Sequence, residues 1–146
     1  MVSEGEPYLL EYNCRMGDPE SEVVFPRLEN DLVELLLAAD SVNLHNQTIK
    51  VKEEACCTVM LASQGYPDQY EKGKVISGIH DSKDVMIFHA GTKESDGNIL
   101  TNGGRVLAIS ALGKTLNEAL EKSYRAASVI EYEGKYYRKD IGKDVL

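Results

Sequence analysis

The chain has 146 residues, of which 42% are hydrophobic, and a formal net charge of −8. This size is enough for one or two small globular units with a buried core. The negative charge argues against a nucleic-acid surface, which needs a basic stripe. The sequence also lacks the run of about 18 apolar residues that crosses a membrane, so we expect neither nucleic acid nor a membrane as a partner.

The cysteines and the first residues indicate a compartment. Three cysteines, with Cys56 and Cys57 adjacent, fit neither a disulfide framework nor a zinc-binding spacing. Residues 1–7 have neither the basic nor the apolar region of a secretory signal. We therefore expect a cytoplasmic protein, with Cys56 and Cys57 in the core because they lie in an apolar run.

Residues 8–15 alternate between apolar and polar side chains, which predicts a strand. Glu11, Asn13 and Arg15 would stand in a row on one face. The oxygens of Glu11 and Asn13 suit a hard cation such as Mg²⁺, and Arg15 could clamp an anionic group. The apolar face would carry Tyr8, Leu10, Tyr12 and Cys14.

The same row has simpler interpretations. An edge strand whose polar face meets water shows this alternation too, and Arg15 could form a salt bridge with Glu11 or Asp18. Residues 17–20, Gly-Asp-Pro-Glu, end the strand, and their Asp18 and Glu20 could place negative charge at the start of the next helix.

Between residues 20 and 40, apolar residues recur at every third or fourth position, which predicts helical structure. Pro26 should interrupt it, giving a short helix followed by a longer one over residues 30–39. Residues 41–47 read as a polar connector, and we place a domain boundary near Asn46.

The second half predicts an antiparallel sheet and one long helix. Strands are expected at residues 48–51, 54–63, 75–76, 85–89, 99–101 and 105–110. The turn Ser95-Asp96-Gly97-Asn98 favours a hairpin. Thr115 and Glu118 predict the start of a helix of about four turns, which covers one face of the sheet. The expected class is α+β.

Several longer strings resemble one enzyme family along the whole chain. The family is glycinamide ribonucleotide synthetase, also called phosphoribosylamine–glycine ligase, within the ATP-grasp superfamily. The matching strings are Glu11–Glu20, Val23–Leu28, Asp31–Leu36, Gly65–Pro67, Phe88–Thr92, Thr101–Leu107 and Tyr136–Gly142.

The resemblance implies an architecture and a reaction. Residues 1–46 would be the end of an ATP-grasp subdomain, and residues 47–146 a small antiparallel-sheet domain with a packed helix. The family joins glycine to 5-phosphoribosylamine with ATP through a glycyl phosphate, in purine biosynthesis. The chain matches the family's C-terminal third, so we expect a fragment that needs the other two-thirds as a partner and is inactive alone.

The resemblance also implies site residues. Glu11 and Asn13 would hold Mg²⁺ or Mn²⁺ against the phosphates of ATP, and Arg15 would be a catalytic group. Asp18 and Glu20 would touch phosphoribosylamine. Residues 102–105, Asn-Gly-Gly-Arg, would line or support the cleft as substrate-binding residues, although Asn102-Gly103 is more commonly a hairpin turn. The residues of this segment are Asn102, Gly103, Gly104 and Arg105.

Two other functions stay open at this stage. One is a non-catalytic scaffold domain, which could form a homo-oligomer through an uncovered apolar surface. The other is a different ATP-grasp ligase, such as a biotin-dependent carboxylase, which shares the Glu-x-Asn-x-Arg row but does not explain the strings at 17–20 and 101–107. The histidines are expected to be packed or solvated, because none has a neighbouring metal ligand.

Overall fold

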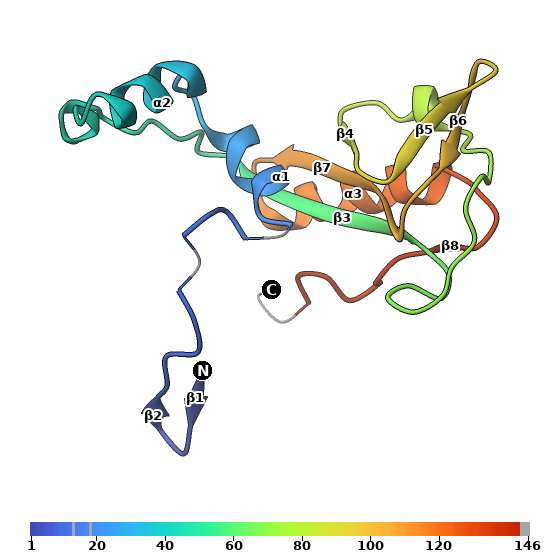
Figure 1. Cartoon of the computed structure of the whole chain (residues 1–146), viewed down its shortest axis with the longest axis horizontal. Helices are drawn as coiled ribbons and strands as arrows, with labels where there is room; N and C mark the ends of the chain where they lie inside the picture. Colours follow the sequence, from blue (N-terminus) through green and yellow to red (C-terminus); the bar gives the residue numbers. More distant parts are fainter. Residues whose placement is uncertain (13, 18, 144–146) are drawn as a thin grey trace.

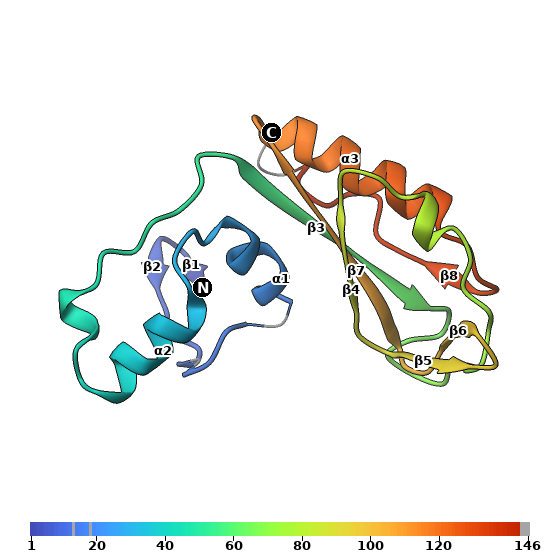
Figure 2. The ribbon, with the colours of Figure 1, turned by 90° about the horizontal axis from the view of Figure 1, so that it is seen from above.

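A four-stranded antiparallel sheet with one helix on its face forms the C-terminal part of the chain (Figures 1 and 2). The computed structural model describes residues 1–12, 14–17 and 19–143. The strand order is β4–β7–β3–β8. The strands are β3 (Ala55–Ser63), β4 (Met86–His89), β7 (Arg105–Gly113) and β8 (Lys135–Tyr136). The predicted α+β class is confirmed.

The two long strands β3 and β7 pair along their whole length. Their register runs from Ala55 opposite Gly113 to Leu61 opposite Leu107, and a bulge follows Leu61. Val59, Leu61, Leu107 and Ile109 are fully buried. Because alternate residues of a strand face the same side, these aliphatic side chains form one apolar surface.

Helix α3 (Leu116–Val129) covers that surface. The Thr115 hydroxyl accepts a hydrogen bond from the Glu118 amide (3.2 Å), so the predicted helix start is confirmed. The Glu118 carboxylate accepts from the Lys114 amide (2.8 Å), one residue before the position that a capping box uses. On the inner face, the buried Ser123 hydroxyl donates to the Cys57 carbonyl (3.0 Å). Cys57 is 5% exposed, which confirms its place in the core.

The C-terminal segment folds back over the sheet and α3. The Tyr132 hydroxyl donates to the Ala62 carbonyl (3.0 Å), and burial raises the pKa of this phenol, so it stays a donor. The Tyr124 hydroxyl of α3 donates to the Arg138 carbonyl (3.1 Å) and accepts from the Ile141 amide (3.0 Å). The described part of the C-terminal tail therefore packs against the body of the domain.

A separate hairpin, β5 (Thr92–Ser95) and β6 (Asn98–Thr101), stands beside the sheet (Figure 1). Its two turn residues, Asp96 and Gly97, have positive φ angles of 52° and 73°, which fit the mirror-image turn that the sequence predicts. A short helix, η3 (Ile79–Asp81), precedes β4. The expected strand at 75–76 is reduced to a single bridge between Val75 and Leu100.

The segment before β3 contains short helices. They are α1 (Ser21–Val24), η1 (Phe25–Arg27), α2 (Leu32–Asp40) and η2 (Leu44–Asn46). Pro26 lies in η1, between two α-helices, as expected from its effect on helices. Asp31 caps α2 by accepting from the amides of Val33 and Glu34. The expected strand at 48–51 is wrong, because only Val51 bridges, to Leu28.

The surface of α2 is largely uncovered. Leu36 and Leu37 are 61% and 63% exposed, and Ala38 is the buried residue of the helix. No helix of the described residues is long and apolar enough to cross a membrane. The predicted domain division at residue 46 stays a prediction.

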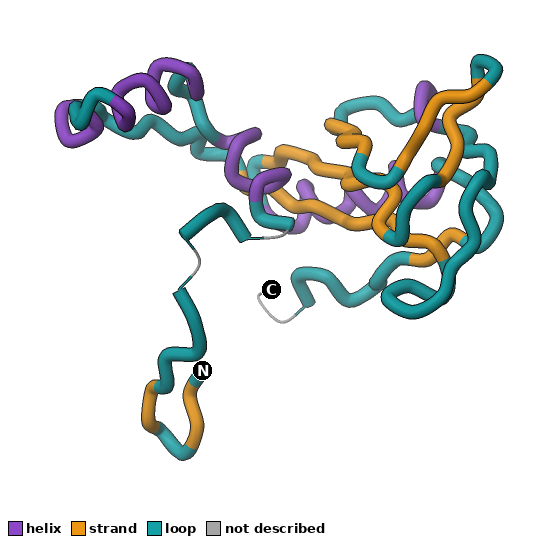
Figure 3. The backbone as a smooth tube through the Cα atoms, viewed as in Figure 1, coloured by secondary structure: helices purple, strands orange, loops and turns teal. Residues whose placement is uncertain are grey.

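The predicted strand over residues 8–15 is wrong for the residues described. The chain begins with a small hairpin, β1 (Val2–Ser3) and β2 (Glu6–Pro7), and residues 8–12 then run as a loop (Figure 3). Tyr8, Leu10 and Tyr12 are 54%, 70% and 86% exposed. Alternation gives a strand only where a neighbouring strand supplies hydrogen bonds. Tyr8 still exchanges two backbone hydrogen bonds with Met1, but within the described ranges no strand pairs with residues 9–12.

We predict that Leu61→Ala destabilises the chain by about 2–5 kcal/mol, because it leaves a cavity beneath α3. Urea denaturation measures this loss of unfolding free energy. The control is Val129→Ala, since Val129 is 42% exposed on α3, and its cost should stay below about 1 kcal/mol. Equal costs at the two positions would contradict the assignment of the core.

Candidate functional site

The predicted metal ligands lie in the N-terminal segment. Glu11 is exposed in the loop that precedes α1, and Asn13 lies outside the described residues. Within the described ranges, no three His, Cys, Asp or Glu side chains come together as a metal site. The three histidines lie in η2, in η3 and at the end of β4, where His89 Nδ1 is 2.9 Å from Thr92 Oγ1.

The residues that follow form a closed turn before α1. The Gly17 amide donates to the Glu20 carboxylate (2.8 Å), and the Glu20 amide donates to the Gly17 carbonyl (2.8 Å). A Cβ on residue 17 would lie 2.3 Å from Glu20 Cδ, so a larger residue here would displace the Glu20 carboxylate from this turn. Arg15 donates to the Met16 carbonyl (3.0 Å), and Asp18 lies outside the described residues. Glu20 thus has a structural contact, whatever its other role.

Asn102-Gly103-Gly104-Arg105 joins β6 to β7, which belong to different sheets. The hairpin interpretation of this segment is therefore wrong. Gly91, after β4, binds it on one side: the Asn102 amide donates to the Gly91 carbonyl (2.7 Å), and the Gly91 amide donates to the Arg105 carbonyl (2.9 Å). The end of β3 binds it on the other side, where the Ser63 amide donates to the Gly104 carbonyl (2.7 Å).

Glycine is required where these segments cross. A Cβ on Gly91 would lie 2.4 Å from the Arg105 carbonyl oxygen and 2.6 Å from Gly103 Cα. A Cβ on Gly104 would lie 2.0 Å from Cδ2 of the Tyr66 ring. Three strings that are far apart in the sequence (65–67, 88–92 and 101–107) therefore meet at one point, which we call the glycine crossing (Gly91, Gly103 and Gly104).

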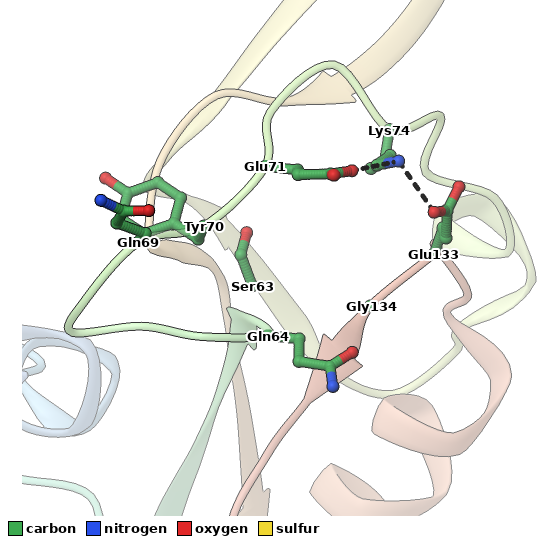
Figure 4. Close-up of a pocket in the computed structure, with 8 residues that line it drawn as sticks. All are labelled: Ser63, Gln64, Gln69, Tyr70, Glu71, Lys74, Glu133 and Gly134. Atoms are coloured by element: carbon green, nitrogen blue, oxygen red, sulfur yellow. Dashed lines mark hydrogen bonds and ion pairs between the residues drawn. The ribbon is translucent and has the colours of Figure 1, made fainter.

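A cavity of about 520 Å³ adjoins the glycine crossing (Figure 4). Ser63 connects the two, because its hydroxyl donates to the Gly103 carbonyl (2.9 Å). Lys74 bridges two carboxylates, at 2.7 Å from Glu71 and 2.8 Å from Glu133. The lining residues are Ser63, Gln64, Gln69, Tyr70, Glu71, Lys74, Glu133 and Gly134.

The sequence did not reveal this cavity. Glu71 and Glu133 are 62 residues apart in the sequence and meet only through Lys74. No spacing rule connects such positions. The one available signal was the Gly65-Tyr66-Pro67 string itself, which lies in the loop that carries Gln69 and Tyr70.

The structure keeps the two predicted groups apart. The N-terminal segment with Glu11 and Arg15 lies away from the β6–β7 connection in both ribbon views (Figures 1 and 2). In the described residues, the glycine crossing lies at the Ser63 end of β3, whereas α1 lies at the other end, where the Thr58 hydroxyl donates to the Glu22 carbonyl (3.2 Å).

The fold and the glycine crossing define a small α+β domain with an antiparallel sheet and one covering helix. Residues 56–144 match the family model described as phosphoribosylglycinamide synthetase, C domain. The chain therefore belongs to the phosphoribosylglycinamide synthetase family, and residues 56–144 match its C domain. This confirms the resemblance noted in the sequence.

Known relatives agree with this assignment. A phosphoribosylamine–glycine ligase from Chlorobaculum tepidum is 46% identical over 149 residues, which cover 100% of this chain and 35% of that protein. The crystal structure of a phosphoribosylamine–glycine ligase from Thermotoga maritima matches with a TM-score of 0.76 and 39% identity, over 96% of this chain and 34% of that one. The chain thus spans about a third of the length of these relatives.

A more distant likeness concerns the fold alone. The urea carboxylase of Kluyveromyces lactis matches with a TM-score of 0.60 at 18% identity, over 97% of this chain and 14% of that one. Such low identity shows a shared architecture, and function has to be argued from the site.

We predict that Gly104→Ala lowers stability because its new methyl group meets the Tyr66 ring. The same substitution made together with Tyr66→Ala should cost less, since the obstructing ring is gone. A double-mutant cycle measured by thermal unfolding should give a coupling free energy of about 0.5–3 kcal/mol.

Gly91→Ala is the contrasting variant. Its clash is with backbone atoms of Arg105 and Gly103, so Tyr66→Ala should not relieve it. Additive effects of Gly104→Ala and Tyr66→Ala would disprove the packing described for the glycine crossing.

Proposed function

We propose that this chain is the C-terminal part of an ATP-dependent ligase that joins glycine to 5-phosphoribosylamine in purine biosynthesis. The observation that carries the proposal is the match to proteins named phosphoribosylamine–glycine ligase. The Chlorobaculum tepidum protein is 46% identical over the whole of this chain. The strings that meet at the glycine crossing also support the proposal, because they are three of the seven strings that carry the resemblance.

The proposed reaction has two steps. The glycine carboxylate attacks the γ-phosphorus of ATP, which gives glycyl phosphate and releases ADP. The amine of 5-phosphoribosylamine then attacks the acyl carbon, its nitrogen loses a proton, and phosphate leaves with the electron pair of the broken C–O bond. Both steps need the reacting groups held in line and their charge balanced.

In this proposal, Glu11 and Asn13 hold a Mg²⁺ or Mn²⁺ ion. A carboxylate and an amide oxygen fit such a hard cation, which keeps its other positions for water and phosphate. The metal would neutralise charge on the phosphates of ATP. Arg15 lies two residues further on, and its guanidinium would hold an anionic group near the transferred phosphoryl group.

The remaining site residues are proposed to face the second substrate. Asn102, Gly103, Gly104 and Arg105 would line the cleft beside 5-phosphoribosylamine. Asp18 and Glu20 would approach its amine or ribose only where the partner polypeptide holds the N-terminal segment over this cleft, because that segment lies away from the β6–β7 connection here (Figures 1 and 2). The support is the close backbone packing at the glycine crossing, which fixes this segment against β3 and Gly91. A rigid backbone is what substrate positioning requires.

The ATP-grasp elements that bind the nucleotide are proposed to come from the polypeptide that corresponds to the other two-thirds of the relatives. We therefore expect this chain to be inactive alone. The cytoplasm is the proposed compartment, since Cys14, Cys56 and Cys57 are free thiols.

A scaffold or oligomerisation role is the second candidate. The observation that favours it is the exposed apolar surface of α2, where Val33, Leu36 and Leu37 are each more than 60% exposed. Such a surface commonly marks a protein–protein contact. It is equally expected of a domain that packs against the rest of a ligase.

The experiment replaces the matching third of the Thermotoga maritima ligase with this chain and measures glycine-dependent release of ADP. We predict activity in this chimera and none for the 146-residue chain alone. Glu11→Gln should lower the activity of the chimera by about tenfold or more, because it removes a charge from the metal site.

The matched control is Glu6→Gln, an exposed glutamate of β2, which should leave the rate unchanged. Calorimetric titration of the 146-residue chain with Mg·ATP separates the two candidate functions further. A folded chimera without glycine-dependent activity would argue for the scaffold role, and turnover by the chain alone would contradict the need for a partner polypeptide.

A further inference from the structure

The cavity beside the glycine crossing is held in shape by the backbone. The loop that leaves β3 at Ser63 returns to β6, where the Gly73 amide donates to the Thr101 carbonyl (2.7 Å). The Lys74 amide donates to the Thr101 hydroxyl (3.0 Å), and the Thr101 amide donates to the Lys74 carbonyl (2.8 Å). Thr101 is fully buried. These bonds fix the loop that carries most of the cavity wall.

The opposite wall comes from the segment after α3. The Gln64 amide donates to the Gly134 carbonyl (2.7 Å), and Glu133 reaches Lys74 from this side. Figure 4 shows Glu71, Lys74 and Glu133 side by side on one rim of the cavity, with Ser63 and Gln64 across from them. The cavity therefore has polar groups on two opposite sides.

Charge decides which ligands fit. The hydrogen bonds to Glu133 and Glu71 raise the pKa of Lys74, and Lys74 lowers the pKa of Glu71. The ammonium is thus already paired with two carboxylates, and the three side chains together carry a net charge of −1 at neutral pH. A phosphate or carboxylate ligand would meet like charge here.

The lining favours hydroxyl groups. Carboxylates accept hydrogen bonds from hydroxyl donors, and the side-chain amides of Gln64 and Gln69 can both donate and accept. Tyr70 adds an aromatic ring that can cover the C–H face of a sugar. A cavity of about 520 Å³ is within the usual size range of small-molecule sites.

We propose that this cavity binds the hydroxyl groups of a pentose, with Glu71 and Glu133 accepting from a vicinal diol and Lys74 holding the two carboxylates in place. The identity of the sugar as the ribosyl group of 5-phosphoribosylamine rests on the proposed function. Its phosphate lies outside the cavity, because the net charge there is negative. Ser63 places the sugar next to the Gly103 carbonyl and hence beside the glycine crossing.

The test is an NMR titration of the ¹⁵N-labelled 146-residue chain with D-ribose, 2-deoxy-D-ribose and inorganic phosphate as separate probes. We expect ribose to shift the backbone amides of residues 63–74 and 133–134. Deoxyribose, which lacks the vicinal diol at C2 and C3, should bind several-fold more weakly, and phosphate should leave these amides unshifted.

Glu133→Gln should raise the Kd for ribose by about tenfold, because it removes a charged acceptor. Glu94→Gln is the matched control, since Glu94 is an exposed glutamate of β5 outside the cavity. A spectrum that is otherwise unchanged verifies that each variant is folded.

The proposal is overturned if ribose causes no shifts at the cavity, if phosphate alone reproduces them, or if Glu133→Gln and Glu94→Gln bind equally. This outcome is independent of the ligase assay. If ribose binds but the chimera is inactive, the sugar site is retained and the proposed reaction is rejected. If the chimera is active but ribose does not bind, the proposed reaction is retained and the sugar site is rejected.

Discussion

The antiparallel ladder between β3 and β7 is the interaction on which the rest of the structure depends. One side of this ladder presents the fully buried side chains of Val59, Leu61, Leu107 and Ile109, and α3 packs on them. β4 pairs with the outer edge of β7, and β8 with the end of β3. Because the ladder runs from Ala55 to Ala62 on β3 and from Gly113 to Arg105 on β7, it also fixes where the segments that leave its ends begin.

The glycine crossing connects this ladder to the candidate site. It lies where β3 ends and β7 begins, so the register of the ladder places Gly104 opposite Ser63. The Tyr66 ring leaves no room for a Cβ at Gly104. The same Ser63 lines the cavity and binds the Gly103 carbonyl. The core ladder and the wall of the cavity are therefore connected through Ser63, whose amide donates to the Gly104 carbonyl and whose hydroxyl donates to the Gly103 carbonyl.

The N-terminal segment has a different physical character. The described residues before α1 make few contacts with the sheet, and their apolar side chains, like those of α2, stay largely exposed. Burial of apolar surface contributes about 25 cal/mol per Å². A complex in which a second polypeptide covers this surface would therefore be substantially stabilised. This agrees with a chain that spans about a third of the length of its relatives and suits the proposal of a partner polypeptide.

The sequence by itself determined the elements whose signals are local. The cap at Thr115, the turn at Asp96-Gly97 and the break at Pro26 appear as predicted, since each depends on neighbours within a few residues. The family also followed from the strings themselves. The roles of Glu11, Asn13, Arg15 and Asp18 stay predictions.

Only the tertiary structure decided what depends on distant partners. The alternation at residues 8–15 resembled a strand but has no neighbouring strand in the described chain, and Asn102-Gly103 crosses between sheets instead of closing a hairpin. The joining of Glu71 to Glu133 through Lys74 could not be predicted either. Strand pairing and cavity walls are made by residues far apart in sequence, and no local pattern specifies which of them meet.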